Sequence, residues 1–293
     1  MRAARVFVGA WRLTRFEHAL IAGLAVVASY TVVCKLTHAE LSAANSITGF
    51  LVGVLITAAS FAINDYFDIE VDRANRRLDR PLVSGEISPS AALYGSMVAY
   101  AVGVGVAALI SIKAFAAALV FATGIGALYS WKLKELHWSV KNVVVGLSYM
   151  VPCVYGCFMV KEASGIVWIN MLVLGMIAFL YGFGREVMKD IIDLEGDKLR
   201  GIRTAAMVVG ARRASQIAAA FFLMAVVMSI VPYISLLRSI WYAAIIAVAD
   251  SIAVVTAMLA LRCSRESLRR SRNYSIIVMG LGILAYTVGA LSI

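Results

Sequence analysis

The chain has 293 residues, of which 62% are hydrophobic and 15% are charged, and its mean hydropathy is +0.87. A soluble domain has about 45–50% apolar and about 25% charged residues. The composition therefore excludes a soluble domain and predicts an all-α, polytopic membrane protein. The formal net charge is +10. The basic residues lie in short loops between apolar segments, which favours membrane topology over nucleic-acid binding.

A membrane-spanning helix needs about 20 apolar residues. On this measure the sequence contains nine candidate spans, at 17–36, 43–65, 90–112, 114–131, 140–160, 165–188, 212–236, 239–261 and 273–292. The linkers between them are short. We therefore expect one helical bundle, a single domain covering residues 1–293, rather than separate domains.

The lysine and arginine residues sort by side across these nine spans. All but four of the 27 basic residues fall on the side of the N-terminus, and the exceptions are Lys35, Lys113, Lys161 and Arg238. Excess Lys and Arg mark the cytoplasmic face of a membrane protein. We therefore expect a multi-pass protein of the cell membrane with a cytoplasmic N-terminus and an outside C-terminus.

Two stretches share one spacing of carboxylates. The first motif, residues 64–72, and the second motif, residues 190–197, both contain D-x-x-D-x-x-x-D, and equivalent positions are 125 residues apart. The aspartates are Asp65, Asp68 and Asp72 in the first motif, and Asp190, Asp193 and Asp197 in the second. Residues at i, i+3 and i+7 share one face of a helix, where like charges repel. Each stripe therefore suggests a bound cation, and oxygen-only ligands favour Mg²⁺ or Ca²⁺.

Each motif closes a long apolar segment, so both lie at a membrane boundary on the predicted cytoplasmic side. Four spans separate them, which is compatible with a parallel internal repeat. Arg and Lys residues are interleaved with the carboxylates, a combination that suits a metal-bound polyphosphate. The alternative is a solvated loop whose charges only fix topology. Two motifs with matched spacing and sidedness favour the binding site.

The run Asn-Asp-x-x-Asp-x-x-x-Asp, the following Arg-Pro-Leu-x-Ser-Gly, and the later Lys-Asp-x-x-Asp-x-x-Gly-Asp together resemble the UbiA superfamily of intramembrane prenyltransferases. The resemblance covers essentially the whole chain. It implies nine helices around a central cavity, capped on the cytoplasmic side by the motif loops. It also implies Mg²⁺-dependent transfer of an isoprenyl group from its diphosphate to a lipophilic acceptor, within the bilayer and without an obligate protein partner.

The same resemblance implies roles for individual residues. The metal and diphosphate ligands would be Asn64, Asp68, Asp72, Asp193 and Asp197. The catalytic residues would be the four aspartates of this set together with Lys189 and with Asp190, which would act as a ligand or as an acceptor-side base. Further substrate contacts would be Arg15, Arg73, Arg77, Tyr129, Lys132, Lys134 and Arg185. Simpler roles stay open for several of them: helix capping for Arg185 and Lys189, membrane anchoring for Lys132 and Lys134, and packing for Tyr129.

The run Arg-Glu-x-x-Lys-Asp-Ile-x-Asp-x-Glu-Gly-Asp, which begins at Arg185, most resembles the archaeal-type enzymes of the family. Those enzymes alkylate geranylgeranylglyceryl phosphate in ether-lipid synthesis, so we expect geranylgeranyl transfer to this acceptor. The runner-up acceptor is 4-hydroxybenzoate, as in quinone synthesis. A divalent-cation transporter is a distant alternative, because its site should lie near the bilayer midplane. Asp250, isolated in the eighth span, is either functional or a buried hydrogen-bonding group.

Overall fold

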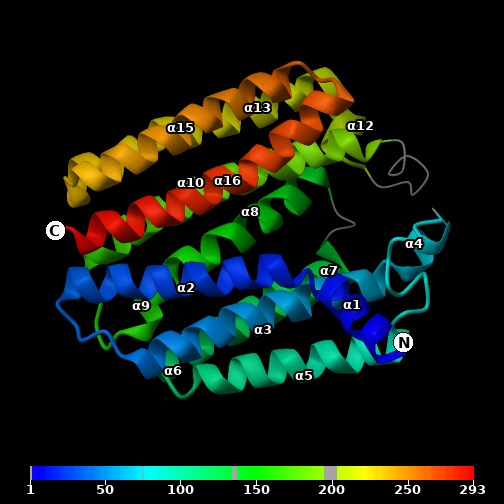
Figure 1. Cartoon of the computed structure of the whole chain (residues 1–293), viewed down its shortest axis with the longest axis horizontal. Helices are drawn as coiled ribbons and strands as arrows, with labels where there is room; N and C mark the ends of the chain where they lie inside the picture. Colours follow the sequence, from blue (N-terminus) through cyan, green and yellow to red (C-terminus); the bar gives the residue numbers. More distant parts are fainter. Residues whose placement is uncertain (1, 75, 134–136, 195–202) are drawn as a thin grey trace. The chain divides into compact units, whose positions relative to one another are not determined.

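The computed structural model of the chain describes residues 2–74, 76–133, 137–194 and 203–293 (Figure 1). Within these ranges the chain is helical and contains no strand, which confirms the predicted all-α class. The chain divides into two compact units. Unit 1 comprises Met1–Val27 and Ser42–Lys134, and unit 2 comprises Ala28–Leu41 and Glu135–Ile293. Helix α2 (Phe16–Thr37) contributes residues to both units.

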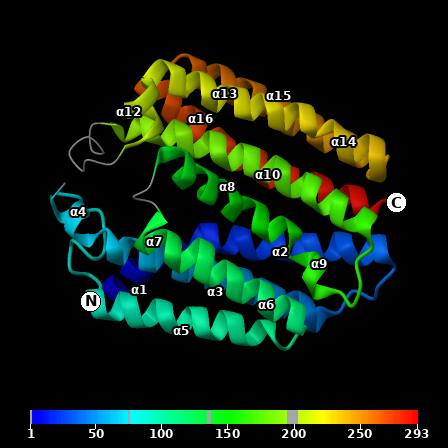
Figure 2. The same ribbon diagram turned by 180° about the vertical axis from the view of Figure 1, so that it is seen from behind.

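Unit 1 is built around α3, which packs against α1, α5 and the π-helical segment η1 (Figure 2). Its elements are α1 (Arg2–Thr14), the first part of α2, α3 (Ala43–Phe67), α4 (Ile69–Ala74), α5 (Pro89–Ala107), α6 (Ile112–Val120), η1 (Phe121–Leu128) and α7 (Tyr129–Trp131). Serine hydroxyls define several helix starts. Ser42, Ser88 and Ser111 each accept a hydrogen bond from the backbone N–H three residues later, which satisfies a donor that the helix leaves unpaired.

Unit 2 is built around α10, which packs against α8, α13 and α16, while α15 lies against α13 and α16 (Figure 1). Its elements are the second part of α2, α8 (Trp138–Val154), α9 (Gly156–Met159), α10 (Gly165–Ile192), α12 (Ala205–Val209), α13 (Ala211–Met228), α14 (Ile230–Pro232), η3 (Tyr233–Leu237), α15 (Ile240–Leu261) and α16 (Arg265–Leu291). Its core joins large residues such as Phe222 and Met188 to a series of alanines on α13 and α15. The alanines allow the helices to approach closely.

Eight helical segments of the described chain are long and apolar enough to cross a membrane. They are Phe16–Thr37, Ala43–Phe67, Pro89–Ala107, Ile112–Trp131, Gly165–Ile192, Ala211–Ser235, Ile240–Leu261 and Arg265–Leu291. The remaining predicted span, 140–160, is divided between α8, which has 17 residues, and the short α9. The polytopic prediction is thus confirmed, whereas the count of nine spans is not.

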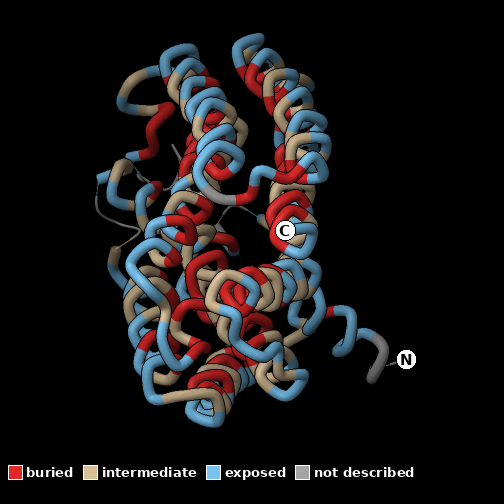
Figure 3. Tube along the Cα trace, turned by 90° about the vertical axis from the view of Figure 1, so that its left-hand side faces the viewer, coloured by how far each residue is buried: buried red, intermediate tan, exposed pale blue. Residues whose placement is uncertain are grey.

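The long helices have exposed residues along their length (Figure 3), and many of these are large and hydrophobic. On α15, for example, Val248, Val255 and Met258 share one face, and each is about half exposed within the protein. Soluble proteins rarely present such continuous apolar surfaces to water. These faces therefore fit contact with lipid.

The break between α8 and α9 is held by a serine from the second part of α2. Pro152 lies inside α8 and supplies no N–H to the helix. The Ser29 hydroxyl donates to the Cys153 carbonyl at 2.7 Å and accepts from the Gly156 N–H at 3.0 Å. Gly156 is required here, because a Cβ atom at this position would lie 2.5 Å from the carbonyl carbon of Ser29.

We predict that Gly156→Ala lowers the free energy of unfolding by about 1–3 kcal/mol, because the backbone of Ser29 has to move to admit a methyl group. Thermal unfolding of the purified protein in detergent measures this change. The control is Gly280→Ala in α16, where an added Cβ meets no atom within 4 Å and stability should be retained. Equal melting temperatures for the two variants would contradict the close approach.

Candidate active site

The first motif bends at its second aspartate. Helix α3 ends at Phe67, Asp68 caps it with φ −92° and ψ −2°, and α4 begins at Ile69. The aspartates of the first motif, whose spacing indicated one helix face, are therefore divided between two helices, although the Asp72 N–H still donates to the Asp68 carbonyl at 2.8 Å.

Two of the predicted metal ligands, Asn64 and Asp68, lie side by side at the end of α3. The Asn64 Nδ2 donates to the Asp68 Oδ2 at 3.0 Å. Asp68 is partly exposed, whereas Asp72 is buried. The end of α3 thus presents one amide and one carboxylate toward the surface of unit 1.

Asp65 and Asp72 are paired with arginines in the interior of unit 1. Asp65 is 3% exposed, and its Oδ1 lies 3.1 Å from the Arg15 Nη2 while its Oδ2 lies 3.1 Å from the Arg80 Nη1. The Arg80 Nε lies 3.6 Å from the Asp72 Oδ2 and has no hydrogen-bond acceptor among the described residues. Burial of carboxylates requires such compensation.

The arginines predicted from the sequence lie elsewhere in this loop. Arg73 pairs with Glu70 at 3.1 Å and Arg77 with Asp79 at 3.5 Å, both pairs being largely solvent-exposed. The arginine that enters the first motif is instead Arg80, which sequence reasoning did not select. Its signal was present, since Arg80 begins the Arg-Pro-Leu-x-Ser-Gly run.

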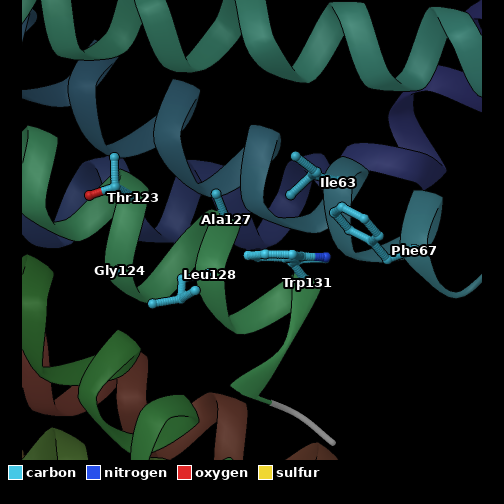
Figure 4. A pocket seen from close by; sticks show the side chains of 7 residues that line it. All are labelled: Ile63, Phe67, Thr123, Gly124, Ala127, Leu128 and Trp131. Carbon is cyan, nitrogen blue, oxygen red and sulfur yellow. The ribbon is translucent and has the colours of Figure 1, made fainter.

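An apolar groove of about 500 Å³ begins beside the first motif (Figure 4). It is lined by Ile63, Phe67, Thr123, Gly124, Ala127, Leu128 and Trp131. Ile63 and Phe67 flank Asn64 along α3, and the opposite wall comes from η1 and α7. Two predicted site residues follow this wall along the chain. Tyr129 is half-buried, and Lys132 is exposed at the end of α7.

The second motif also places one aspartate inside the protein and the next at a helix end. Asp190 is 1% exposed. Its Oδ1 accepts from the Lys141 Nζ at 2.5 Å, and its Oδ2 accepts from the Asn142 Nδ2 at 3.3 Å and the Ala205 N–H at 3.2 Å. Asp193 is the C-terminal cap of α10, with φ −95° and ψ 4°, and is partly exposed.

Glu186 completes the acidic interior of this end of unit 2. It lies one turn before Asp190, 3.3 Å from the Lys141 Nζ and 3.4 Å from the Lys189 Nζ. Lys189 itself is 47% exposed. Sequence reasoning selected Lys189 but missed Glu186, Lys141 and Asn142.

Two further predicted residues, Arg185 and Asp250, make hydrogen bonds to neighbouring helices, and two others lie outside the described ranges. The Arg185 guanidinium donates to the Arg272 carbonyl at 2.9 Å and to the Ser275 hydroxyl at 2.6 Å, which ties α10 to α16. Asp250 accepts a hydrogen bond from the Ser229 hydroxyl at 2.7 Å. Lys134 and Asp197 lie outside the described residues.

No three His, Cys, Asp or Glu side chains of the described ranges are placed together so as to hold a metal ion. The donor chemistry nevertheless fits Mg²⁺, because Asn64, Asp68, Asp72 and Asp193 offer only oxygen ligands. Within unit 1, the apolar groove, the Asn64–Asp68 pair at the end of α3 and the exposed Lys132 form a combination that suits an isoprenyl diphosphate.

Membrane-spanning helices with such a groove and two such motifs define an intramembrane prenyltransferase. The chain belongs to the UbiA prenyltransferase family, which it matches over residues 18–283. It is 36% identical to the digeranylgeranylglyceryl phosphate synthase of Archaeoglobus fulgidus, over 99% of this chain and 98% of that protein.

Solved structures share the fold. One described as a digeranylgeranylglyceryl phosphate synthase in membranes superimposes with a TM-score of 0.75 at 27% identity, and covers 98% of this chain and 99% of its own. A UbiA homologue from Archaeoglobus fulgidus bound to GPP and Mg²⁺ gives a TM-score of 0.66 at 20% identity, with 95% and 99% coverage.

We predict different costs for two arginine substitutions in the first-motif loop. Arg80→Gln removes a counter-ion that the buried Asp65 and Asp72 share, and should cost about 3–5 kcal/mol of unfolding free energy. Arg73→Gln removes only an exposed pair and should cost less than about 1 kcal/mol. Thermal unfolding in detergent compares them, and a larger loss for Arg73→Gln would contradict the assignment of Arg80.

Proposed function

We propose that this prenyltransferase transfers a geranylgeranyl group from its diphosphate to geranylgeranylglyceryl phosphate, a step of membrane ether-lipid synthesis. The proposal rests chiefly on the near full-length similarity to the synthase of Archaeoglobus fulgidus. The basic residues beside both motifs support it, because both the donor and this acceptor carry phosphate groups.

We infer that Mg²⁺ is the metal, held by Asn64, Asp68, Asp72, Asp193 and Asp197. The oxygen-only donor set supports this choice, and a protein of the same fold is bound to GPP and Mg²⁺. When bound, Mg²⁺ supplies electrostatic stabilisation of the leaving diphosphate.

Side chains of the protein would stabilise the two charges that form when the diphosphate leaves. Departure of diphosphate from an allylic carbon leaves positive charge on the isoprenyl chain, which an apolar, water-poor groove protects. The rings of Phe67 and Trp131 at the groove (Figure 4) are suited to stabilise a cation. We assign Lys132 and Lys189, which are both exposed, to the diphosphate. Tyr129 and Lys134, which lie close to Lys132 in sequence, are further candidates.

We propose that the whole chain works as one domain, because the family match spans residues of both units. The positive-inside rule supports a cytoplasmic position for the N-terminus and both motifs. If α8 and α9 together make a ninth crossing, the C-terminus lies outside.

The acceptor is tested by incubating the purified protein with radiolabelled geranylgeranyl diphosphate and Mg²⁺, and offering geranylgeranylglyceryl phosphate or 4-hydroxybenzoate in parallel. We expect labelled diether phosphate only. Product from 4-hydroxybenzoate alone would contradict the proposed acceptor and indicate a role in quinone synthesis.

The metal site is tested by Asp68→Ala, which should lower the transfer rate by about 100-fold or more while the melting temperature is retained. The control is Asp79→Ala in the same loop, whose side chain is 66% exposed and whose removal should leave the rate unchanged. Chelation of Mg²⁺ should abolish transfer, and readdition should restore it. A metal-independent rate would refute the site.

A further inference from the structure

The first aspartate of each motif makes the same set of contacts in its own unit. In unit 1, Arg15 lies immediately before α2 and reaches two positions one turn apart on α3. Its guanidinium carbon lies 4.5 Å from the centre of the Phe61 ring, and its Nη2 lies 3.1 Å from Asp65. A basic side chain from the start of one helix is thereby fixed to the end of the motif helix.

In unit 2, Lys141 lies in the first turn of α8 and reaches two positions one turn apart on α10. Its Nζ lies 3.3 Å from Glu186 and 2.5 Å from Asp190. These two positions are 125 residues after Phe61 and Asp65, and Lys141 is 126 residues after Arg15. The repeat seen in the aspartates therefore includes the basic side chain that binds each of them.

A second contact of each aspartate repeats as well. Asp65 binds the Arg80 guanidinium, and Asp190 binds the Ala205 N–H, in each case 15 residues later in the chain. Each aspartate thus joins three segments: the motif helix, the start of the helix before it, and a segment that follows the motif.

Among the residues that the structure describes, the ion pairs of each cluster join two basic and two acidic side chains. In unit 1, Arg15 and Arg80 face Asp65 and Asp72, and in unit 2, Lys141 and Lys189 face Glu186 and Asp190. Removal of one member leaves an unpaired charge in a largely buried place, whereas removal of an oppositely charged pair keeps the balance.

The two aspartates also have their acceptor oxygens occupied. Both carboxylate oxygens of Asp65 and of Asp190 accept hydrogen bonds from the protein, and both residues are nearly inaccessible. Asp68 and Asp193, by contrast, cap their helices and are partly exposed. A carboxylate whose oxygens are engaged in this way is poorly placed to become a metal ligand.

We propose that Asp65 and Asp190 are equivalent positioning residues and not metal ligands. Each holds a cation from the preceding helix and a donor from the following segment, and so fixes the helix end at which the next aspartate, Asp68 or Asp193, stands. This inference deepens the proposed function and rests on its assignment of the metal to Asp68 and Asp193.

The test is a double-mutant cycle on Asp190→Asn and Lys141→Met, read out as transfer rate, melting temperature and Mn²⁺ affinity by electron paramagnetic resonance. Each single variant should lower the rate by about tenfold or more, and the pair should recover to within about threefold of the unmodified protein. Mn²⁺ affinity should fall less in Asp190→Asn than in Asp193→Asn, and it should recover in the pair. Lys141→Arg, which keeps the charge, should retain activity.

The matched control is Asp193→Asn, three residues later. It should weaken Mn²⁺ binding by about tenfold or more at an unchanged melting temperature, and Lys141→Met should not rescue it.

If Asp190→Asn alone fails to fold but the double variant folds, that result would also support the proposal. A pair that remains unfolded, inactive or unable to bind Mn²⁺ would overturn it. Full Mn²⁺ affinity in Asp193→Asn would instead refute the proposed metal site, while the rescue would still decide the role of Asp190.

Discussion

A carboxylate that is buried at the end of an apolar helix needs a positive or hydrogen-bonding partner, and this requirement shapes both motif ends of the protein. Asp65 and Asp190 are almost inaccessible, and each is bound by side chains that come from distant parts of the chain. The pairing is costly to disturb, because a single unpaired charge in such a place is far less stable than a balanced cluster.

This pairing explains why the motif helices end where they do. With the first aspartate held inside, Asp68 and Asp193 become the caps of α3 and α10 and face partly outward. An apolar groove starts one residue before Asn64 on α3. Polar groups and an apolar surface therefore meet at one helix end, and our proposal assigns the first to the diphosphate and the second to the isoprenyl chain.

The sequence predicted features that depend on local pattern and missed those that depend on burial. Apolar length identified the membrane segments, and spacing identified both motifs. Arg73, Arg77 and Arg80 are indistinguishable by residue type, however, and only the fold places Arg80 beside Asp65 and leaves the other two at the surface. Lys141 was missed for the same reason, although its offset from Arg15 nearly matches the repeat. The helix break at Asp68 depends on the partners of its neighbours, which a spacing argument does not include.

The divided segment α8–α9 has a consequence for how the protein is made. A broken helix has backbone groups without a partner in the segment itself, which would be unfavourable if the segment crossed hydrocarbon. Here the Ser29 hydroxyl bonds both the Cys153 carbonyl and the Gly156 N–H. Because α2 precedes α8 along the chain, Ser29 is synthesised before the break whose backbone groups it bonds. The order of helices thus provides the partner of the broken segment before the segment itself is made.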